Sequence, residues 1–195
     1  MKYSLELACS SSQQWLNAVM QDFHSFLQDH ANCERKASAM AMSLVAKYPD
    51  RKEIIPELIE TAIEELEHFQ QVYNLMERLN VPLANEMQKD EYISQLMALG
   101  HGGTPLTRFM DRLLLASVIE CRGCERFKMV SEALQEPELK RFYKVLWASE
   151  AKHGNIFVKM ALKYFDDKKV YDRLAWLVEQ EGKIVNSLPL RSALH

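Results

Sequence analysis

Apolar residues recur at steps of three and four along almost all of this 195-residue chain, which is the period of an amphipathic α-helix. Four of the segments with this period are long, and no part of the chain is rich in the patterns of β-strands. Glycine and proline, which interrupt helices most often, number only six each. We therefore expect an all-α protein built on four long helices.

The pattern predicts one domain over residues 1–195, because no low-complexity linker divides the chain. The long helices are expected at about 23–47, 51–80, 105–134 and 137–164. Shorter accessory helices are expected at about 11–21, 85–99 and 168–188. The segment GHGGTPLTR joins the two pairs of long helices, as an ordinary connection or as a mouth loop that receives a nucleotide. Two similar hairpins of this kind predict a four-helix bundle.

One carboxylate in the helix at 51–80 lies on the wrong side of the helix for a solvated group. Glu64 and Glu67 belong to a polar stripe, as their spacing from other charged residues shows. Glu65 instead falls on the opposite, apolar stripe, and His68 projects beside it three residues later. We therefore expect Glu65 and His68 to face the protein interior.

The same pattern returns in the second half of the chain. Glu150 and His153 form another Glu-x-x-His pair on an apolar stripe of the helix at 137–164. The two remaining long helices contribute one carboxylate each to their apolar stripes, Glu34 and Glu120. Glu34 precedes Glu65 by 31 residues and Glu120 precedes Glu150 by 30. In an antiparallel hairpin, such matched intervals place both carboxylates at a similar height.

Four carboxylates in one apolar interior would repel one another and would be costly to desolvate. Protonation could relieve the repulsion, but two divalent cations relieve it better, because their four positive charges balance the carboxylates. A single Glu-x-x-His is a weak signal, more often a solvated pair; the joint pattern is what predicts a site for two metals. The predicted ligands are Glu34, Glu65, His68, Glu120, Glu150 and His153.

This ordered set of residues resembles the ferritin-like di-iron carboxylate superfamily. Within it, the chain is most similar to the bacterial tRNA hydroxylases that act on 2-methylthio-N6-isopentenyladenosine beside the anticodon. The similarity is carried by HANCERKASAMAMSLV, IETAIEELEHFQQV, GHGGTPLTR, ASVIECRGCERF and ASEAKHGNIFV. It implies a ferritin-like four-helix bundle, two iron ions, O2 as co-substrate, and the tRNA anticodon loop as partner. The electrons would come from a ferredoxin or reductase, because no flavin, Rossmann or rubredoxin pattern is present.

Two other functions fit the same ligand pattern. A di-iron quinone hydroxylase would bind membranes, for example through the amphipathic helix at 168–188. A ferritin- or rubrerythrin-like protein would store iron or remove peroxide. No apolar run reaches the roughly 18 residues of a spanning helix, and no signal peptide is visible, so we expect a cytoplasmic protein without a membrane partner. The sequence leaves the oligomeric state open, as a monomer or a small oligomer.

Binding to an anticodon loop requires cations, although the net charge is only −3. For any one of the candidates, a solvated helix face is the simpler interpretation. The candidate RNA-binding residues are Arg108, Arg112, Arg122, Arg126, Lys140, Arg141, Lys144 and Lys152, with Lys128 nearby.

The four cysteines are expected to be reduced thiols rather than a disulfide framework. The CRGC motif, from Cys121 to Cys124, lies within a helix, so it is better explained by small residues packing near the metals than by redox chemistry. His24, His30, His101 and His195 are not expected to be ligands, because they lie off the helix stripes.

Overall fold

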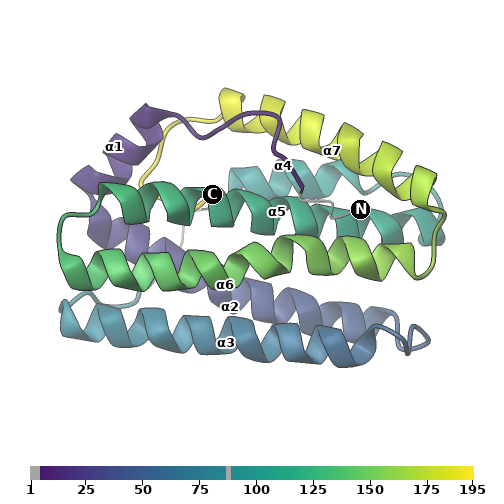
Figure 1. Ribbon diagram of the computed structural model, residues 1–195, viewed down its shortest axis with the longest axis horizontal. Helices are drawn as coiled ribbons and strands as arrows, with labels where there is room; N and C mark the ends of the chain where they lie inside the picture. The colour runs from purple at the N-terminus through teal and green to yellow at the C-terminus, as the bar shows by residue number, and fades with distance from the viewer. Residues whose placement is uncertain (1–4, 87–88) are drawn as a thin grey trace. The chain divides into compact units, whose positions relative to one another are not determined.

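The computed structural model describes residues 5–86 and 89–195, and every regular element within them is an α-helix (Figure 1). The expectation of an all-α chain is therefore confirmed. In chain order, the helices are α1 (Gln13–Gln21), α2 (Phe23–Lys47), α3 (Ile55–Arg78), α4 (Glu91–Leu99), α5 (Pro105–Ala133), α6 (Pro137–Leu162) and α7 (Asp167–Ser187).

Two of the expected helices begin later than the sequence pattern indicated. The helix expected at 51–80 is α3, and it begins at Ile55 because Pro56 occupies its first turn, where a missing N–H costs nothing. The helix expected at 85–99 is α4, whose start is set by Asp90: its carboxylate accepts a hydrogen bond from the Ile93 N–H at 2.9 Å. Residues 87–88 of that expected range lie outside the described residues.

The chain separates into two compact units, and the division falls inside α1. One unit, here called the first-hairpin unit, contains residues 17–86, 89 and 191–194. The second-hairpin unit contains residues 5–16, 90–190 and 195. Each unit is built on one pair of long helices, as the internal similarity of the sequence indicated.

In the first-hairpin unit, α2 and α3 pack along each other and are joined by residues 48–54 (Figure 1). Their facing stripes bury Phe26, Leu27 and Leu58. The hydroxyl of Ser38 also donates to the carbonyl oxygen of Ala62 across the pair, at 2.7 Å. Apolar burial and this bond set the register in which the polar residues of the two helices meet.

Residues 191–194 complete the first-hairpin unit although they are distant from it in sequence. The N–H of Leu194 donates to Asp29 Oδ2 at 2.8 Å, and the Ser192 hydroxyl donates to the carbonyl oxygen of Asp22 at 2.6 Å. Leu194 itself is buried. The side chain of Asp29 and the start of α2 thus receive hydrogen bonds from a segment more than 160 residues away.

In the second-hairpin unit, α5 and α6 pack along each other, and α4 and α7 pack against them (Figure 1). Only residues 134–136 join α5 to α6. Both long helices begin with a capping side chain followed by proline: Thr104 caps α5, and Glu136 caps α6. The short connection makes the two helices antiparallel neighbours.

A buried ion pair joins α5 to α7 within this unit. Arg122 has no exposed surface, and its guanidinium donates to both carboxylate oxygens of Glu181, at 2.7 and 2.9 Å. The Tyr92 hydroxyl donates to the same carboxylate at 3.1 Å. Burial, followed by the charge of Glu181, raises the pKa of Tyr92 well above its ordinary value. Burial opposes the charge on Arg122, but its bonds to Glu181 keep the pKa of Arg122 above the ordinary value.

The same arginine anchors the segment that precedes α1. Arg122 Nη2 donates to the carbonyl oxygen of Cys9 at 3.0 Å, and Arg126 Nε donates to the Ser11 hydroxyl at 3.0 Å. The N–H and hydroxyl of Ser11 both donate to the carboxylate of Glu125, at 2.7 and 2.8 Å. Residues 9–11 are therefore tied to one face of α5.

Candidate metal centre

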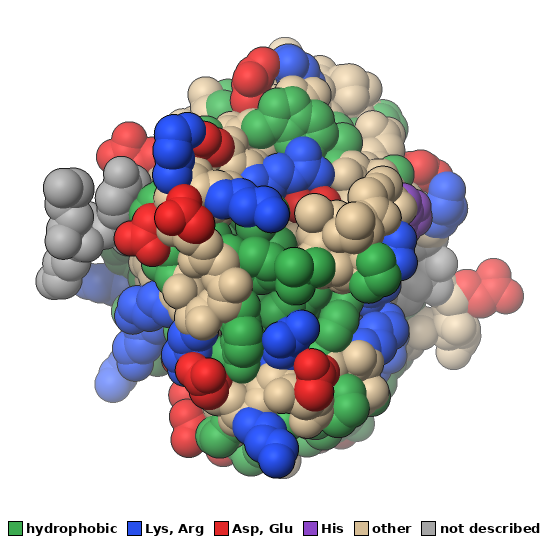
Figure 2. Space-filling view, turned by 90° about the vertical axis from the view of Figure 1, so that its right-hand side faces the viewer, with side chains coloured by type: hydrophobic (Ala, Val, Ile, Leu, Met, Phe, Trp, Pro, Cys, Tyr) green, Lys and Arg blue, Asp and Glu red, His purple; other side chains and the backbone are tan. Residues whose placement is uncertain are grey.

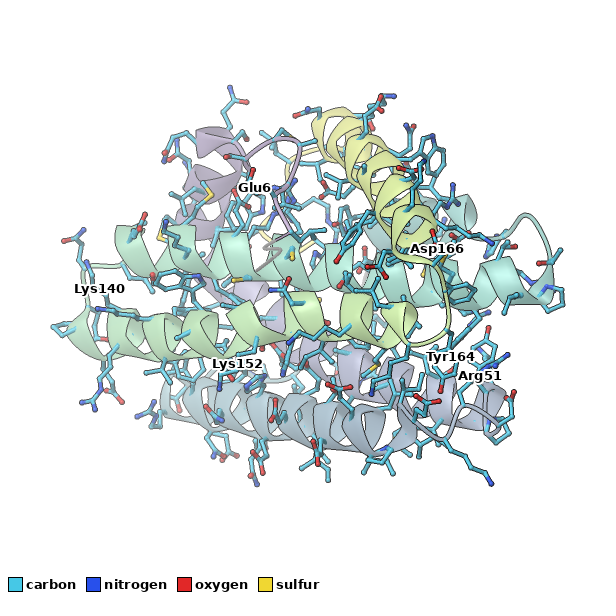
Figure 3. All side chains as sticks on the ribbon, turned by 45° about the vertical axis from the view of Figure 1, so that its right-hand side comes forward. Glu6, Arg51, Lys140, Lys152, Tyr164 and Asp166 are labelled. Atoms are coloured by element: carbon cyan, nitrogen blue, oxygen red, sulfur yellow. The ribbon has the colours of Figure 1, made fainter. Side chains whose placement is uncertain are left out.

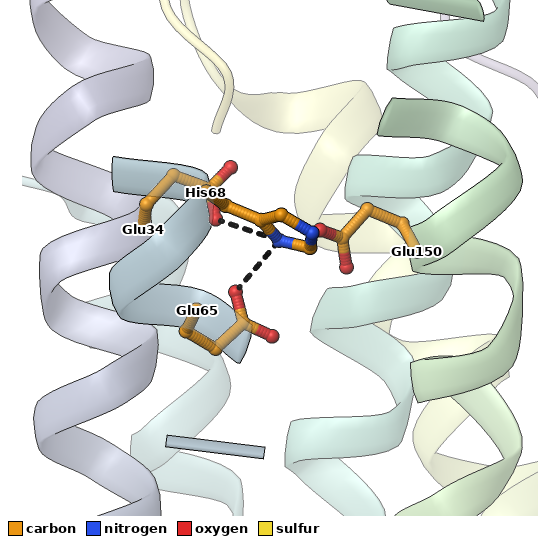
Figure 4. Close-up of side chains that lie close together, drawn as sticks. All are labelled: Glu34, Glu65, His68 and Glu150. Atoms are coloured by element: carbon orange, nitrogen blue, oxygen red, sulfur yellow. Dashed lines mark ion pairs between the residues drawn. The ribbon is translucent and has the colours of Figure 1, made fainter. Parts of the chain in front are cut away.

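The first-hairpin unit brings together Glu34 from α2 with Glu65 and His68 from α3. All three side chains are buried, and each offers a ligand atom within 4.8 Å of the other two. His68 Nδ1 lies 3.8 Å from Glu34 Oε2 and 3.6 Å from Glu65 Oε2, the two ion pairs drawn in Figure 4. Their neighbours Glu64 and Glu67 are exposed. The expectation that Glu65 and His68 face the interior while Glu64 and Glu67 meet solvent is therefore confirmed.

His30 is part of this group, although its position in the sequence seemed to exclude it. The expectation placed it off the apolar stripe of its helix, but it is fully buried, with Nε2 2.7 Å from Glu34 Oε1. It lies four residues before Glu34, so the two side chains meet on one face of α2. That i, i+4 spacing was visible in the sequence. The imidazole of His30 orients the Glu34 carboxylate, as outer partners of metal ligands commonly do.

The second-hairpin unit repeats the arrangement with Glu120 from α5 and Glu150 and His153 from α6. Each of these residues offers a ligand atom within 4.8 Å of the other two. Glu150 and His153 are buried, whereas Glu120 is half-buried. His153 Nδ1 lies 2.9 Å from Glu150 Oε2. Each unit therefore holds two carboxylates and one imidazole that converge on a small volume.

A glycine lets α5 and α6 approach closely beside the second group. A Cβ added at Gly154 would lie 2.5 Å from Cys121 Sγ, closer than real Cβ atoms come to other heavy atoms. The Ser117 hydroxyl donates to the carbonyl oxygen of Gly154 at 2.5 Å. Because Gly154 follows His153 directly, this close contact fixes the height at which the imidazole projects from α6.

The CRGC thiols fit the packing interpretation. Burial is the largest cause that raises the pKa of Cys121 to about 12 and that of Cys124 to about 11. The next cause is the Cys124 thiol for Cys121 and the Glu150 carboxylate for Cys124. Both thiols are free, and Cys124 Sγ donates to the carbonyl oxygen of Trp147 at 3.8 Å. Reactive cysteines need a lowered pKa, so these two side chains act as small neutral residues between α5 and α6.

The donors in each group suit a divalent transition metal. Carboxylate oxygens and imidazole nitrogens are ligands of iron, manganese and zinc, and a pair of buried carboxylates carries the charge that one such ion neutralises. The alternative is two ionised carboxylates held in an apolar interior, which is costly. Each unit thus contains a candidate metal group whose residues fit a bound metal.

Two of the predicted RNA-binding cations are not surface residues. Arg122 is fully buried against Glu181, and Arg126 is buried with its guanidinium 4.6 Å from the ring centre of Trp15. Burial lowers the pKa of Arg126 to about 10. Their partners lie far away in the sequence, so the helix pattern alone did not show that they are interior. Both residues stabilise the fold, and the prediction that they contact RNA is wrong because they are buried.

The remaining predicted cations are at least partly accessible. Arg108 and Arg112 are half-buried, and Arg108 donates to the carbonyl oxygen of Gly103 at 2.9 Å, within the GHGGTPLTR loop. The others, Lys140, Arg141, Lys144 and Lys152, are exposed on α6. Figure 3 shows Lys140 near the start of α6 and Lys152 farther along it. On the face in Figure 2, Lys and Arg side chains are interspersed with Asp and Glu, rather than gathered in a field of one sign.

Within the described residues, no helix combines the length and the apolar character needed to cross a bilayer. Buried glutamates and Glu-x-x-His pairs on long helical hairpins define the ferritin-like class of carboxylate metal proteins. A solved structure supports this class: the chain has a TM-score of 0.91 and 30% identity to a protein from Synechococcus described as Protein 43 with aldehyde deformylating oxygenase activity. The match covers 97% of this chain and 94% of that one. The expected fold class, an all-α ferritin-like bundle with accessory helices, is confirmed.

The chain belongs to the tRNA-(MS[2]IO[6]A)-hydroxylase (MiaE) family, whose model matches residues 2–195. It is 38% identical over 164 residues to the tRNA 2-(methylsulfanyl)-N(6)-isopentenyladenosine(37) hydroxylase of Pseudomonas putida, which covers 84% of this chain and 78% of that protein. It is 25% identical to the enzyme of the same name from Salmonella typhimurium, over 93% of this chain and 84% of that one. The family suggested by the sequence motifs is confirmed.

Proposed function

We propose that this protein hydroxylates the isopentenyl group of 2-methylthio-N6-isopentenyladenosine in tRNA, next to the anticodon. The observation that carries the proposal is the pair of matched carboxylate and imidazole groups, one in each hairpin unit, in a member of a tRNA hydroxylase family. The curated relatives are named for this nucleoside. Family membership favours this function over quinone hydroxylation or iron storage.

In this proposal the protein binds two iron ions through the six ligands predicted from the sequence. Glu34, Glu65 and His68 come from one unit, and Glu120, Glu150 and His153 come from the other. Four carboxylates then balance the charge of two divalent ions, and the imidazoles complete the ligand set. The matched intervals of 31 and 30 residues within the hairpins support this assignment.

The iron pair, when bound, would supply the activation of O2. In the balanced reaction, one oxygen atom enters a C–H bond of the prenyl group, and the other leaves as water with two protons and two electrons. The chain's own residues hold the metals, orient the carboxylates and surround them with apolar side chains. The electrons come from an external ferredoxin or reductase in the cytoplasm, where tRNA is modified.

The exposed cations of α6 are the best candidates for phosphate contacts. Lys140 and Lys144 are four residues apart, so they share one face of the helix. Lys144→Glu should weaken tRNA binding and lower the slope of log K against log salt by about 1. Lys183→Glu makes the same charge change at an exposed position of α7 and should leave the slope unchanged. Equal salt-dependence slopes for the two variants would show that Lys144 of α6 does not contact the RNA.

The function is tested by mass spectrometry of tRNA nucleosides. Deleting the gene should remove the hydroxylated nucleoside, and restoring the wild-type chain should return it. A nucleoside profile that does not change on deletion would refute the proposal.

The metal assignment has a matched pair of variants on α3. Glu65→Ala should lose at least one of two irons per chain, measured by elemental analysis, whereas Glu64→Ala should keep both because Glu64 is exposed. His153→Ala tests the other unit in the same way. Full iron content in Glu65→Ala and His153→Ala would refute the ligand set.

A further inference from the structure

The second-hairpin unit contains a cavity of about 360 Å³ that reaches Glu150. One wall is the segment that precedes α1, and the other walls are α5 and α6. Apolar and thiol side chains make up much of its surface, and its polar lining includes the carboxylates of Glu6, Glu125 and Glu150. Its lining also includes Leu5, Leu7, Cys121, Lys128, Ala151 and Asn155. Its volume is at the lower end of the range for small-molecule sites.

The outer wall is built to stay in place. Along residues 5–10, Leu5, Leu7 and Cys9 are half-buried and the even-numbered residues are exposed, and Leu5 and Leu7 line the cavity. The end of this segment is fixed by Arg122, which donates to the carbonyl oxygen of Cys9, and by the two bonds from Ser11 to Glu125. Figure 3 shows Glu6 on this segment, beside the helical hairpin.

The cavity adjoins the basic face of α6. Ala151 and Asn155 line it, and both continue the face that carries Lys140 and Lys144. With a rise of 1.5 Å per residue, Lys144 lies about 10 Å before Ala151 along the helix, and Lys140 about 16 Å. Lys128 of α5, which is exposed, adds a cation at the cavity itself.

We propose that this cavity receives the prenylated adenine base of the tRNA, with the prenyl chain directed toward Glu150. The inference rests on the proposed function and names the site through which its substrate reaches the metal ligands. A branched five-carbon chain suits the leucine, alanine and thiol surface of the cavity. Polar lining groups such as Asn155 contact the purine. The cations on α6 contact the phosphates on either side of the nucleotide, whose base is turned out of its stack.

The test fills the cavity from a position on α6 that tolerates a larger side chain. Ala151 and Ala148 are both exposed alanines on this helix, but only Ala151 lines the cavity. Ala151→Leu should therefore block the base, and Ala148→Leu is the matched control. The probes are two anticodon stem-loop RNAs, identical except that one carries 2-methylthio-N6-isopentenyladenosine and the other carries adenosine. Binding is measured on iron-loaded protein without a reductant, so the result does not depend on turnover.

Wild type and Ala148→Leu should bind the prenylated RNA about tenfold or more tightly than the unmodified RNA. Ala151→Leu should bind both RNAs equally, at the affinity of wild type for the unmodified one. A preference that survives in Ala151→Leu, or no preference in wild type, would overturn this site. Hydroxylation in cells is measured separately. If the wild-type chain modifies tRNA but Ala151→Leu still prefers the prenylated RNA, the proposed function stands and only the proposed binding cavity is rejected.

Discussion

Replacing Arg122 by methionine should be among the most destabilising single changes in this chain. Arg122 and Glu181 are both fully buried, and the guanidinium makes two bonds to the carboxylate, at 2.7 and 2.9 Å. Arg122→Met removes these bonds and leaves the carboxylate in the interior with the Tyr92 hydroxyl at 3.1 Å. Stranding one partner of a buried ion pair costs about 3–5 kcal/mol. The bond that holds Cys9 to α5 is lost as well.

That cost is a large share of the roughly 5–15 kcal/mol by which a domain is stable. For a chain of this length, each kcal/mol moves the melting temperature by about 2–4 °C, so a fall of about 6–20 °C is expected. Guanidinium unfolding followed by circular dichroism gives the free energy, and a thermal scan gives the melting temperature. Lys168→Met is the control, because its bond to Asp172 lies on the surface.

A double variant separates the stranded charge from the lost side-chain packing. Arg122→Met with Glu181→Met removes both charges and replaces them with apolar side chains, which is often close to neutral for buried pairs. The double variant should therefore regain most of the stability that the single variant loses. An Arg122→Met variant as stable as Lys168→Met, or a double variant as unstable as Arg122→Met, would show that the stranded carboxylate is not the source of the loss.

Three further predictions concern the contact between α5 and α6. Gly154→Ala should lower the free energy of unfolding by about 1–3 kcal/mol, because its Cβ would meet Cys121 Sγ at 2.5 Å. Gly123→Ala should raise it by about 0.5–1 kcal/mol, because its Cβ meets nothing within 4 Å. Denaturant unfolding measures both, and the reverse order would contradict the close contact at Gly154. The raised pKa values of Cys121 and Cys124, about 12 and 11, should make both thiols slow to alkylate at neutral pH in the folded chain, as peptide mass spectrometry would show. The unfolded thiols lose their protons from about pH 9, whereas the folded thiols keep theirs, so the free energy of unfolding should fall between pH 9 and 12. The fall should be smaller in Cys121→Ala. An equal fall in wild type and Cys121→Ala would contradict the raised pKa of Cys121.

The parts of the molecule that the sequence predicted are those governed by local periodicity. The bounds of α2 follow from its apolar stripe, and the same stripe argument separated Glu65 from Glu64 on α3. Periodicity fails just before Pro56, because residues 52–54 form turns where the apolar pattern indicated a helix. Element ends depend on capping and proline chemistry more than on periodicity.

The features that the sequence did not predict depend on partners far away in the chain. Arg122 looked like one more surface cation, because its partner Glu181 lies 59 residues later, on another helix. The cavity wall at residues 5–10 could not be predicted either, because its anchors are side chains of α5. His30 is the exception, because its partner Glu34 is only four residues away. The sequence showed this spacing but did not show that His30 is buried.

The hydrogen bond from Leu194 to Asp29 has a consequence for the order in which the chain is made. Its two partners are 165 residues apart, and a ribosome that adds 5–20 residues per second makes them roughly ten to thirty seconds apart. During that interval α2 and α3 can pair, but the carboxylate of Asp29 lacks this donor. The helix that carries Glu34 therefore reaches its final arrangement only after Leu194 has been synthesised.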